Sequence, residues 1–260
     1  MATAPALEKP GRFWHVRGSW SPRDDRGPFA VYLGIFWAGM IAGFGLDFPR
    51  FLRQTPPAPM SIRVHAVVFT GWMLLLTAQV LLVLRNRVAW HRKMGWVAAG
   101  WACLMAIMGP WAAMASQTAH MHSPGFFPQF LSINLVDIGG FLILLAWGIA
   151  LRRNPAAHKR MMILATVSLA DPGFNRFADW LIPAIPASVP AMFLFIFYGN
   201  VVLVLLIAAW DWRRRRLMRQ FVVGAAGLLS AEFIATLLLF WGPWRAVTAA
   251  AVAAWARHFG

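Results

Sequence analysis

The sequence contains a single cysteine, Cys103, among its 260 residues. One cysteine excludes an intramolecular disulfide, a Cys-x-x-Cys redox pair and a Cys-x-x-Cys-His haem attachment motif. Charged residues are also scarce, at 13%, whereas 60% of the chain is hydrophobic. A soluble protein of this length has too little interior to bury so many apolar side chains. The composition therefore predicts an integral membrane protein.

Recognisable catalytic motifs are missing as well. The chain has no Gly-x-Ser-x-Gly, no phosphate-binding P-loop, no His-Glu-x-x-His and no histidine-box set of a membrane di-iron oxygenase. The polar segments between the apolar ones are too short to form a catalytic domain. The sequence therefore leaves open whether the protein is an enzyme.

Seven stretches are apolar over roughly the 20 residues that a membrane helix needs. They are residues 29–47, 64–84, 94–115, 130–151, 160–182, 189–210 and 220–242. We therefore predict an all-α polytopic membrane protein with seven transmembrane helices. Its parts are a basic and aromatic cytoplasmic N-terminal segment over 1–28, a transmembrane domain over 29–242 and an outer-face tail over 243–260.

The basic residues gather in alternate connections between these stretches. Of the 24 Lys and Arg, five lie in residues 1–28, four in 85–93, four in 152–160 and five in 211–219. Lys and Arg accumulate in cytoplasmic loops, so we expect the N-terminus inside and the C-terminus outside. The net charge of +15 is then a topology signal. It favours a bilayer with an anionic inner leaflet as the partner, and not nucleic acid.

Two of the basic loops are similar to each other. Residues 85–94 (RNRVAWHRKM) align with residues 152–161 (RRNPAAHKRM), so that His91 and His158 occupy equivalent positions. We interpret residues 64–115 and 130–182 as two copies of one helical hairpin, an arrangement that usually surrounds a central site. Convergence of two inner loops on a basic composition is the alternative.

Acidic and basic side chains within the spans are candidate site residues. Carboxylates are expensive at membrane depth, so Asp137 and Glu232 are expected to face the bundle interior and to titrate there. Arg176 lies between Asp171 and Asp179 in the sequence. We expect Arg176 to neutralise one of these two carboxylates.

A stripe of polar and aromatic residues runs along the second span. His65, Trp72 and Gln79 are spaced by seven residues and therefore share one helix face. We expect the stripe to contact a ligand or cofactor in a polar cavity that opens outward. Packing of Trp72 and an interhelical hydrogen bond of Gln79 are the alternative.

The histidines divide between the two ends of the spans. His91 and His158 lie at the inner end, where they are candidate haem ligands or, alternatively, helix caps that bind lipid phosphates. His65, His120 and His122 lie at the outer end. They are candidate metal ligands, because imidazoles with nearby methionines suit copper, and His65 with either of the others would also give the two imidazoles of a haem site.

A sequence pattern joins several of these residues. The series His65-Ala66, Gln79 and His91-Arg92-x-x-Gly95 resembles a widespread group of uncharacterised bacterial multi-pass membrane proteins with a His…Gln…His-Arg-x-x-Gly hairpin. The second hairpin, with Asp137, then His158-Lys159-Arg160-Met161 and Arg176, is similar to the later half of that group. The resemblance covers roughly residues 30–212 and implies a bacterial inner-membrane protein.

The first hairpin is also similar to those of b-type membrane cytochromes, in which histidines near both membrane faces hold haem. This chain departs from that pattern, because its histidines lie at span ends rather than a turn or two inside. We expect a membrane redox or electron-transfer protein with haem b or a quinone in the bundle. A proton-coupled small-molecule transporter is one alternative. The other is an accessory subunit of a larger membrane complex, with Gly39-x-x-x-Gly43 as its packing face.

Overall fold

The computed structural model describes residues 25–55, 57–182 and 185–259, and these are helical without any strand. The elements are α1 (Arg26–Arg53), α2 (Met60–Leu84), α3 (Val88–Ala119), the short 3-10 helix η1 (Pro128–Phe130), α4 (Leu131–Ala150), α5 (Pro155–Val167), α6 (Asp171–Leu181), α7 (Val189–Arg213), α8 (Arg219–Leu239) and α9 (Gly242–Phe259). The all-α prediction is confirmed for these ranges. Residues 1–24 of the expected basic N-terminal segment over 1–28 lie outside the described residues.

Six helices are long and apolar enough to cross a membrane: α1, α2, α3, α4 with η1, α7 and α8. They correspond to the first four, the sixth and the seventh of the predicted spans. Their outward faces carry large apolar side chains, such as Val67, Trp96 and Ile143, that are at least 70% exposed. Such a surface suits lipid rather than water. The architecture is that of a multi-pass membrane protein.

The predicted fifth span, residues 160–182, is not one continuous helix. Residues 168–170 separate α5 from α6, and Pro172 stands in the first turn of α6. Proline has no N–H and clashes with the carbonyl four residues earlier, so a continuous helix would be disrupted here, whereas the start of a new helix tolerates the ring. The prediction of a single helix over this range is therefore wrong.

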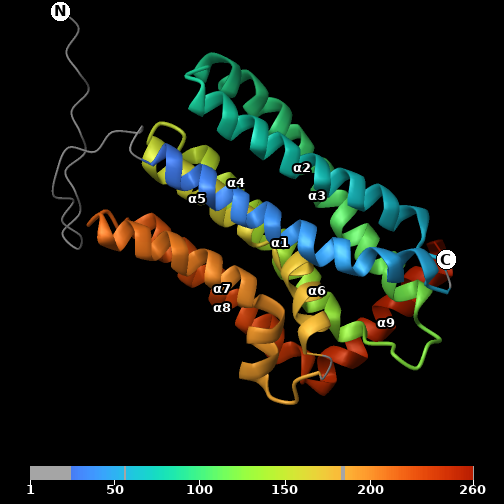
Figure 1. The fold of residues 1–260 in the computed structure, drawn as a ribbon. Helices are drawn as coiled ribbons and strands as arrows, with labels where there is room; N and C mark the ends of the chain where they lie inside the picture. The colour runs from blue at the N-terminus through green and yellow to red at the C-terminus, as the bar shows by residue number, and fades with distance from the viewer. Residues whose placement is uncertain (1–24, 56, 183–184, 260) are drawn as a thin grey trace, which may run out of the picture.

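Two groups of helices, the α2–α3 hairpin and the α7–α8 pair, lie on either side of α1 and α6. Figure 1 shows the α2–α3 hairpin on one side of the molecule and α7 and α8 on the other, with α1 crossing the middle. The pairs α2–α3 and α4–α5 pack closely, and α6 lies against both α1 and α7. The main core joins α1, α2, α3, α4, α5, α7 and α8 through buried side chains such as Phe36, Met105, Phe141 and Leu164.

The described part of the segment predicted as an outer tail, residues 243–259, belongs to helix α9. It packs against η1 and α3. Trp244 Nε1 donates to the Gln129 carbonyl at 3.1 Å, and the rings of Trp111 and Trp255 meet edge to face at 5.1 Å. These contacts attach the end of the chain to the bundle.

The Gly39-x-x-x-Gly43 face of α1 is used inside the chain. A Cβ at Gly43 would lie 1.7 Å from the Gly173 carbonyl oxygen, and one at Gly39 would lie 2.1 Å from the Phe174 ring. Both neighbours belong to α6. The packing face considered for docking to another subunit is therefore occupied by this chain's own helix.

Candidate functional site

Polar and aromatic side chains line the contact between the two helical hairpins. We call Trp72, Gln79, His91, His158 and Thr166 the inter-hairpin interface. Trp72 is 2% exposed, and its Nε1 donates to Thr166 Oγ1 at 3.3 Å, which joins α2 to α5. Trp72 therefore points into the bundle, as the alternative of packing also requires, and the contact of the stripe with a ligand stays a prediction.

The two equivalent histidines lie next to each other at one end of this interface. The ring centroids of His91 and His158 are 6.3 Å apart, with the rings nearly perpendicular at 82°. His158 Nδ1 donates to the Gly148 carbonyl at 2.7 Å, which leaves Nε2 for another partner. His91 lies against the main-chain carbonyl of Gln79, and its buried Nδ1 has no hydrogen-bond partner. The sequence similarity of the loops therefore corresponds to spatial proximity.

A narrow crevice of about 20 Å³ separates α1 from α2 and α5. Its walls are mostly apolar, and Thr166 contributes to them. Tyr32 lines the crevice, and its buried hydroxyl group has no hydrogen-bond partner. Gln79 Oε1, on the same helix as one wall, is likewise buried and unpartnered. Buried polar atoms normally have partners, so these atoms mark a place where a bound group would be stabilised.

Two predicted site residues lie inside the bundle but away from the histidines. Asp137 is 7% exposed and Glu232 is fully buried. Glu232 Oε1 accepts a hydrogen bond from Asn200 Nδ2 at 2.7 Å. Both carboxyl groups thus face the interior as expected, although they do not contact the α2 stripe in any recorded bond.

Arg176 has a different partner from the one expected. Its Nε donates to Asp47 Oδ2 at 2.9 Å, and its Nη1 donates to the Pro172 carbonyl at 2.7 Å. The guanidinium also lies 4.6 Å from the centre of the Phe44 ring. The direct ion pair of Arg176 therefore joins α6 to α1, whereas its charge acts on Asp171 and Asp179 without a direct contact that the structure records.

The outer histidines are not brought together as a metal site. His65 stacks on Phe69 with ring centroids 4.0 Å apart, whereas His120 is exposed and its Nδ1 donates to the Ser116 carbonyl at 2.8 Å. His122 is exposed as well. Over the part of the chain that the structure describes, no group of three or more His, Cys, Asp or Glu side chains is placed to hold a metal ion. The metal site at these positions gains no support and stays a prediction.

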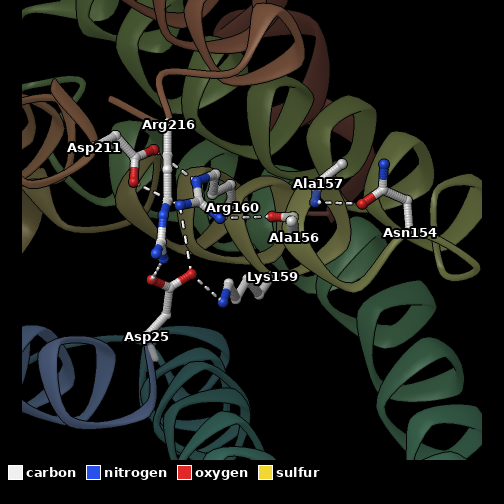
Figure 2. Close-up of polar contacts among 8 residues, drawn as sticks. All are labelled: Asp25, Asn154, Ala156, Ala157, Lys159, Arg160, Asp211 and Arg216. Atoms are coloured by element: carbon white, nitrogen blue, oxygen red, sulfur yellow. Dashed lines mark hydrogen bonds and ion pairs between the residues drawn. The ribbon is translucent and has the colours of Figure 1, made fainter. Parts of the chain in front are cut away.

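The structure shows one further cluster of charged residues. From the sequence alone, its basic residues are only a signal of membrane topology. We call Asp25, Lys159, Arg160, Asp211 and Arg216 the ion network (Figure 2). Arg160 binds Asp211 in two places, through Nε at 2.6 Å and Nη2 at 2.5 Å, and also reaches Asp25 at 3.5 Å. Lys159 pairs with Asp25, and Arg216 lies 3.7 Å from it. Asp25, Arg160 and Asp211 are at most 1% exposed, so this network joins the ends of α1, α5 and α7 in the interior.

Comparisons with protein-family models, with curated proteins and with solved structures find no match. The function is therefore argued from the geometry of these residues alone. The resemblance to the bacterial multi-pass group stays a prediction.

Proposed function

We propose that this chain is a membrane redox protein in which His91 and His158 would hold a b-type haem at the inter-hairpin interface. The observation that carries the proposal is the approach of these two histidines from equivalent positions of the repeat. With metal–nitrogen bonds of about 2 Å on each side, two imidazoles on one iron have ring centroids roughly 6 Å apart. The separation of 6.3 Å fits that requirement.

The surroundings of the two rings support the same ligand set. A ligating histidine usually donates its other ring N–H to a carbonyl or carboxylate, which fixes the ring and its tautomer. The bond from His158 Nδ1 to the Gly148 carbonyl has that form. A bound haem would supply one-electron transfer. The protein's residues would hold the iron and set the polarity of its surroundings. A ring of this size needs room between the two histidines, so we expect the α2–α3 hairpin to part from the α4–α5 hairpin when it binds.

A quinone is the second candidate, and a different observation favours it. The hydroxyl of Tyr32 is buried and unpartnered at a crevice between α1, α2 and α5. A quinone carbonyl needs such a donor, and a quinone's apolar groups suit the apolar side chains that line this crevice. Extraction of the purified protein with organic solvent would reveal a bound quinone.

Visible spectroscopy tests the haem proposal directly. Protein purified from haem-supplied cells should give a reduced-minus-oxidised b-type band, and His91→Ala or His158→Ala should abolish it. His120→Ala is the matched control, because His120 is exposed and removed from the pair, and it should leave the band unchanged. A featureless spectrum of the wild-type protein under these conditions would contradict the proposal.

We further propose that α5 and α6 together make one crossing, giving seven, with the N-terminus in the cytoplasm of a bacterial cell. The basic loops support this orientation. In a Cys103→Ser background, a membrane-impermeant maleimide should label Gly125→Cys in intact cells, and Arg153→Cys only after permeabilisation. Both positions are exposed. Labelling of Arg153→Cys in intact cells would show that the orientation is opposite to the proposed one.

A further inference from the structure

The break between α5 and α6 lies among acidic and amide side chains from four helices. Asp137 comes from α4, Asp171 opens α6, Asn200 comes from α7 and Glu232 from α8. We call these four residues the carboxyl cluster. Their exposed fractions are 7, 4, 0 and 0%, so water does not hydrate them from outside. Carboxyl groups buried at membrane depth normally have a functional role and a partner.

Two members of the cluster need a proton between them. The side chains of Asp137 and Asp171 are in hydrogen-bonding contact with each other. An ionised carboxylate only accepts hydrogen bonds, so two carboxyl groups can bond to each other only if at least one of them is protonated. Two carboxyl groups in contact also cannot both be ionised without a large energetic cost. A hydrogen bond between the two side chains therefore needs at least one proton on the pair.

The other two members, Asn200 and Glu232, bond to each other, and each keeps one buried oxygen without a partner. Asn200 Nδ2 donates to Glu232 Oε1 at 2.7 Å, which directs the amide toward the carboxyl group. The second oxygen of each residue, Asn200 Oδ1 and Glu232 Oε2, is buried without a hydrogen-bond partner. The same is true of the Oδ1 atoms of Asp137 and Asp171. Each of the three carboxyl groups thus keeps a buried oxygen with room for a proton.

The helix break gives this site its backbone. Ser168 caps the end of α5, and its hydroxyl lies 2.7 Å from the Ala165 carbonyl and 3.2 Å from the Asp137 carbonyl, the two acceptors open to it. Interrupted helices at membrane depth are tolerated where they are buried in protein, and they recur at ion sites of transporters. The interruption places Asp171 at the start of α6, directly beside Asp137.

We propose that the carboxyl cluster is an exchangeable proton site, in which Asp137 and Asp171 share one proton and Glu232 binds a second. Among the described residues, the charges that act on the pair are Glu232 from α8 and Arg176 from α6, and the latter is paired with Asp47 of α1. Toward the pair, α5 offers the Ser168 hydroxyl, α7 the Asn200 amide, and α3 no charged group within the described ranges. The site is independent of any haem or quinone, so the two proposals can fail separately.

Infrared difference spectroscopy of the purified protein in lipid tests the proton site. At neutral pH the wild-type protein should show the carbonyl band of protonated carboxyl groups, and the band should shift when water is exchanged for D₂O. Asp137→Asn or Asp171→Asn should remove the shared-proton component, and Glu232→Gln should remove a separate one. Asp47→Asn is the matched control, because its carboxylate is ion-paired with Arg176 and Arg50, and it should leave the band intact.

Spectra of the wild-type protein test the proton site even where a variant does not fold. Isotope-labelled aspartate shifts the band of Asp137 and Asp171 and leaves that of Glu232 in place. An aspartate band that exchanges in D₂O and disappears at alkaline pH supports the proposal. A protein without any protonated carboxyl band at neutral pH overturns it, and so does a band that resists both D₂O and alkali, since the hydrogen bond would then be purely structural.

Discussion

Replacing Asp211 with alanine is expected to destabilise the protein by about 3–5 kcal/mol, because it leaves a buried guanidinium without its principal counter-ion. Arg160 is 1% exposed and makes two charge-assisted bonds to Asp211, at 2.5 and 2.6 Å. Figure 2 shows that Asp25 is the remaining acidic partner, and Lys159 and Arg216 also approach it. Unfolding in mixed micelles, followed by circular dichroism, measures the loss.

Two further variants separate the buried pair from charge removal in general. Asp47→Ala removes a carboxylate whose partners Arg50 and Arg176 are 76% and 34% exposed, so the expected loss is about 1 kcal/mol or less. The double variant Arg160→Met with Asp211→Leu replaces both charges by apolar groups of similar volume and should recover most of the loss. An Asp211→Ala protein within about 1 kcal/mol of the wild type would show that Arg160 finds another partner at no cost.

The ion network also shows where reasoning from the sequence stops. Lys159, Arg160 and Arg216 lie in loops whose charge already had an explanation in the positive-inside rule. Lys93, the residue equivalent to Arg160 in the repeat, is exposed over the Trp90 ring. Equivalent sequence positions therefore differ in burial, because only Arg160 meets the end of α7. That contact joins residues 51 positions apart and leaves no local pattern.

Most of the helical architecture could be predicted, because apolar length is a local property. Six of the seven apolar stretches correspond to helices long enough to cross a membrane. The interruption of the fifth stretch was missed, although Asp171-Pro172-Gly173 is a local signal for it. Proline alone does not decide the matter, since Pro49 and Pro110 lie within α1 and α3. Gly173 is the second part of the signal at this interruption. It is a glycine because α1 approaches its backbone too closely for any side chain.

Candidate site residues were predictable where a repeat or a depth argument applied. The aligned loops pointed to His91 and His158, and these rings do meet. The cost of burying a carboxylate pointed to Asp137 and Glu232, and both are buried. The partners of these groups could not be predicted, because Asn200 and Asp171 reach them only through the packing of α6, α7 and α8.

The close approach of α1 and α6 gives the second large effect. Gly43→Ala is expected to destabilise the protein by about 3 kcal/mol or more, because overpacking cannot be relieved by a side-chain rotation here. The added Cβ would lie 1.7 Å from the Gly173 carbonyl oxygen, so α1 and α6 would have to move apart. That movement would also strain the Arg176–Asp47 ion pair, which joins the same two helices. Unfolding in mixed micelles measures the change.

Gly45→Ala is the matched control, since Gly45 lies on the same helix with no atom within 4 Å of an added Cβ. It makes the same chemical change and removes the same backbone freedom, so it should leave stability unchanged or raise it by up to about 1 kcal/mol. The two substitutions are thus expected to differ in sign although they are two residues apart. Equal effects would mean that α1 and α6 do not touch at Gly43, and the position of α6 between α1 and α7 would have to be revised.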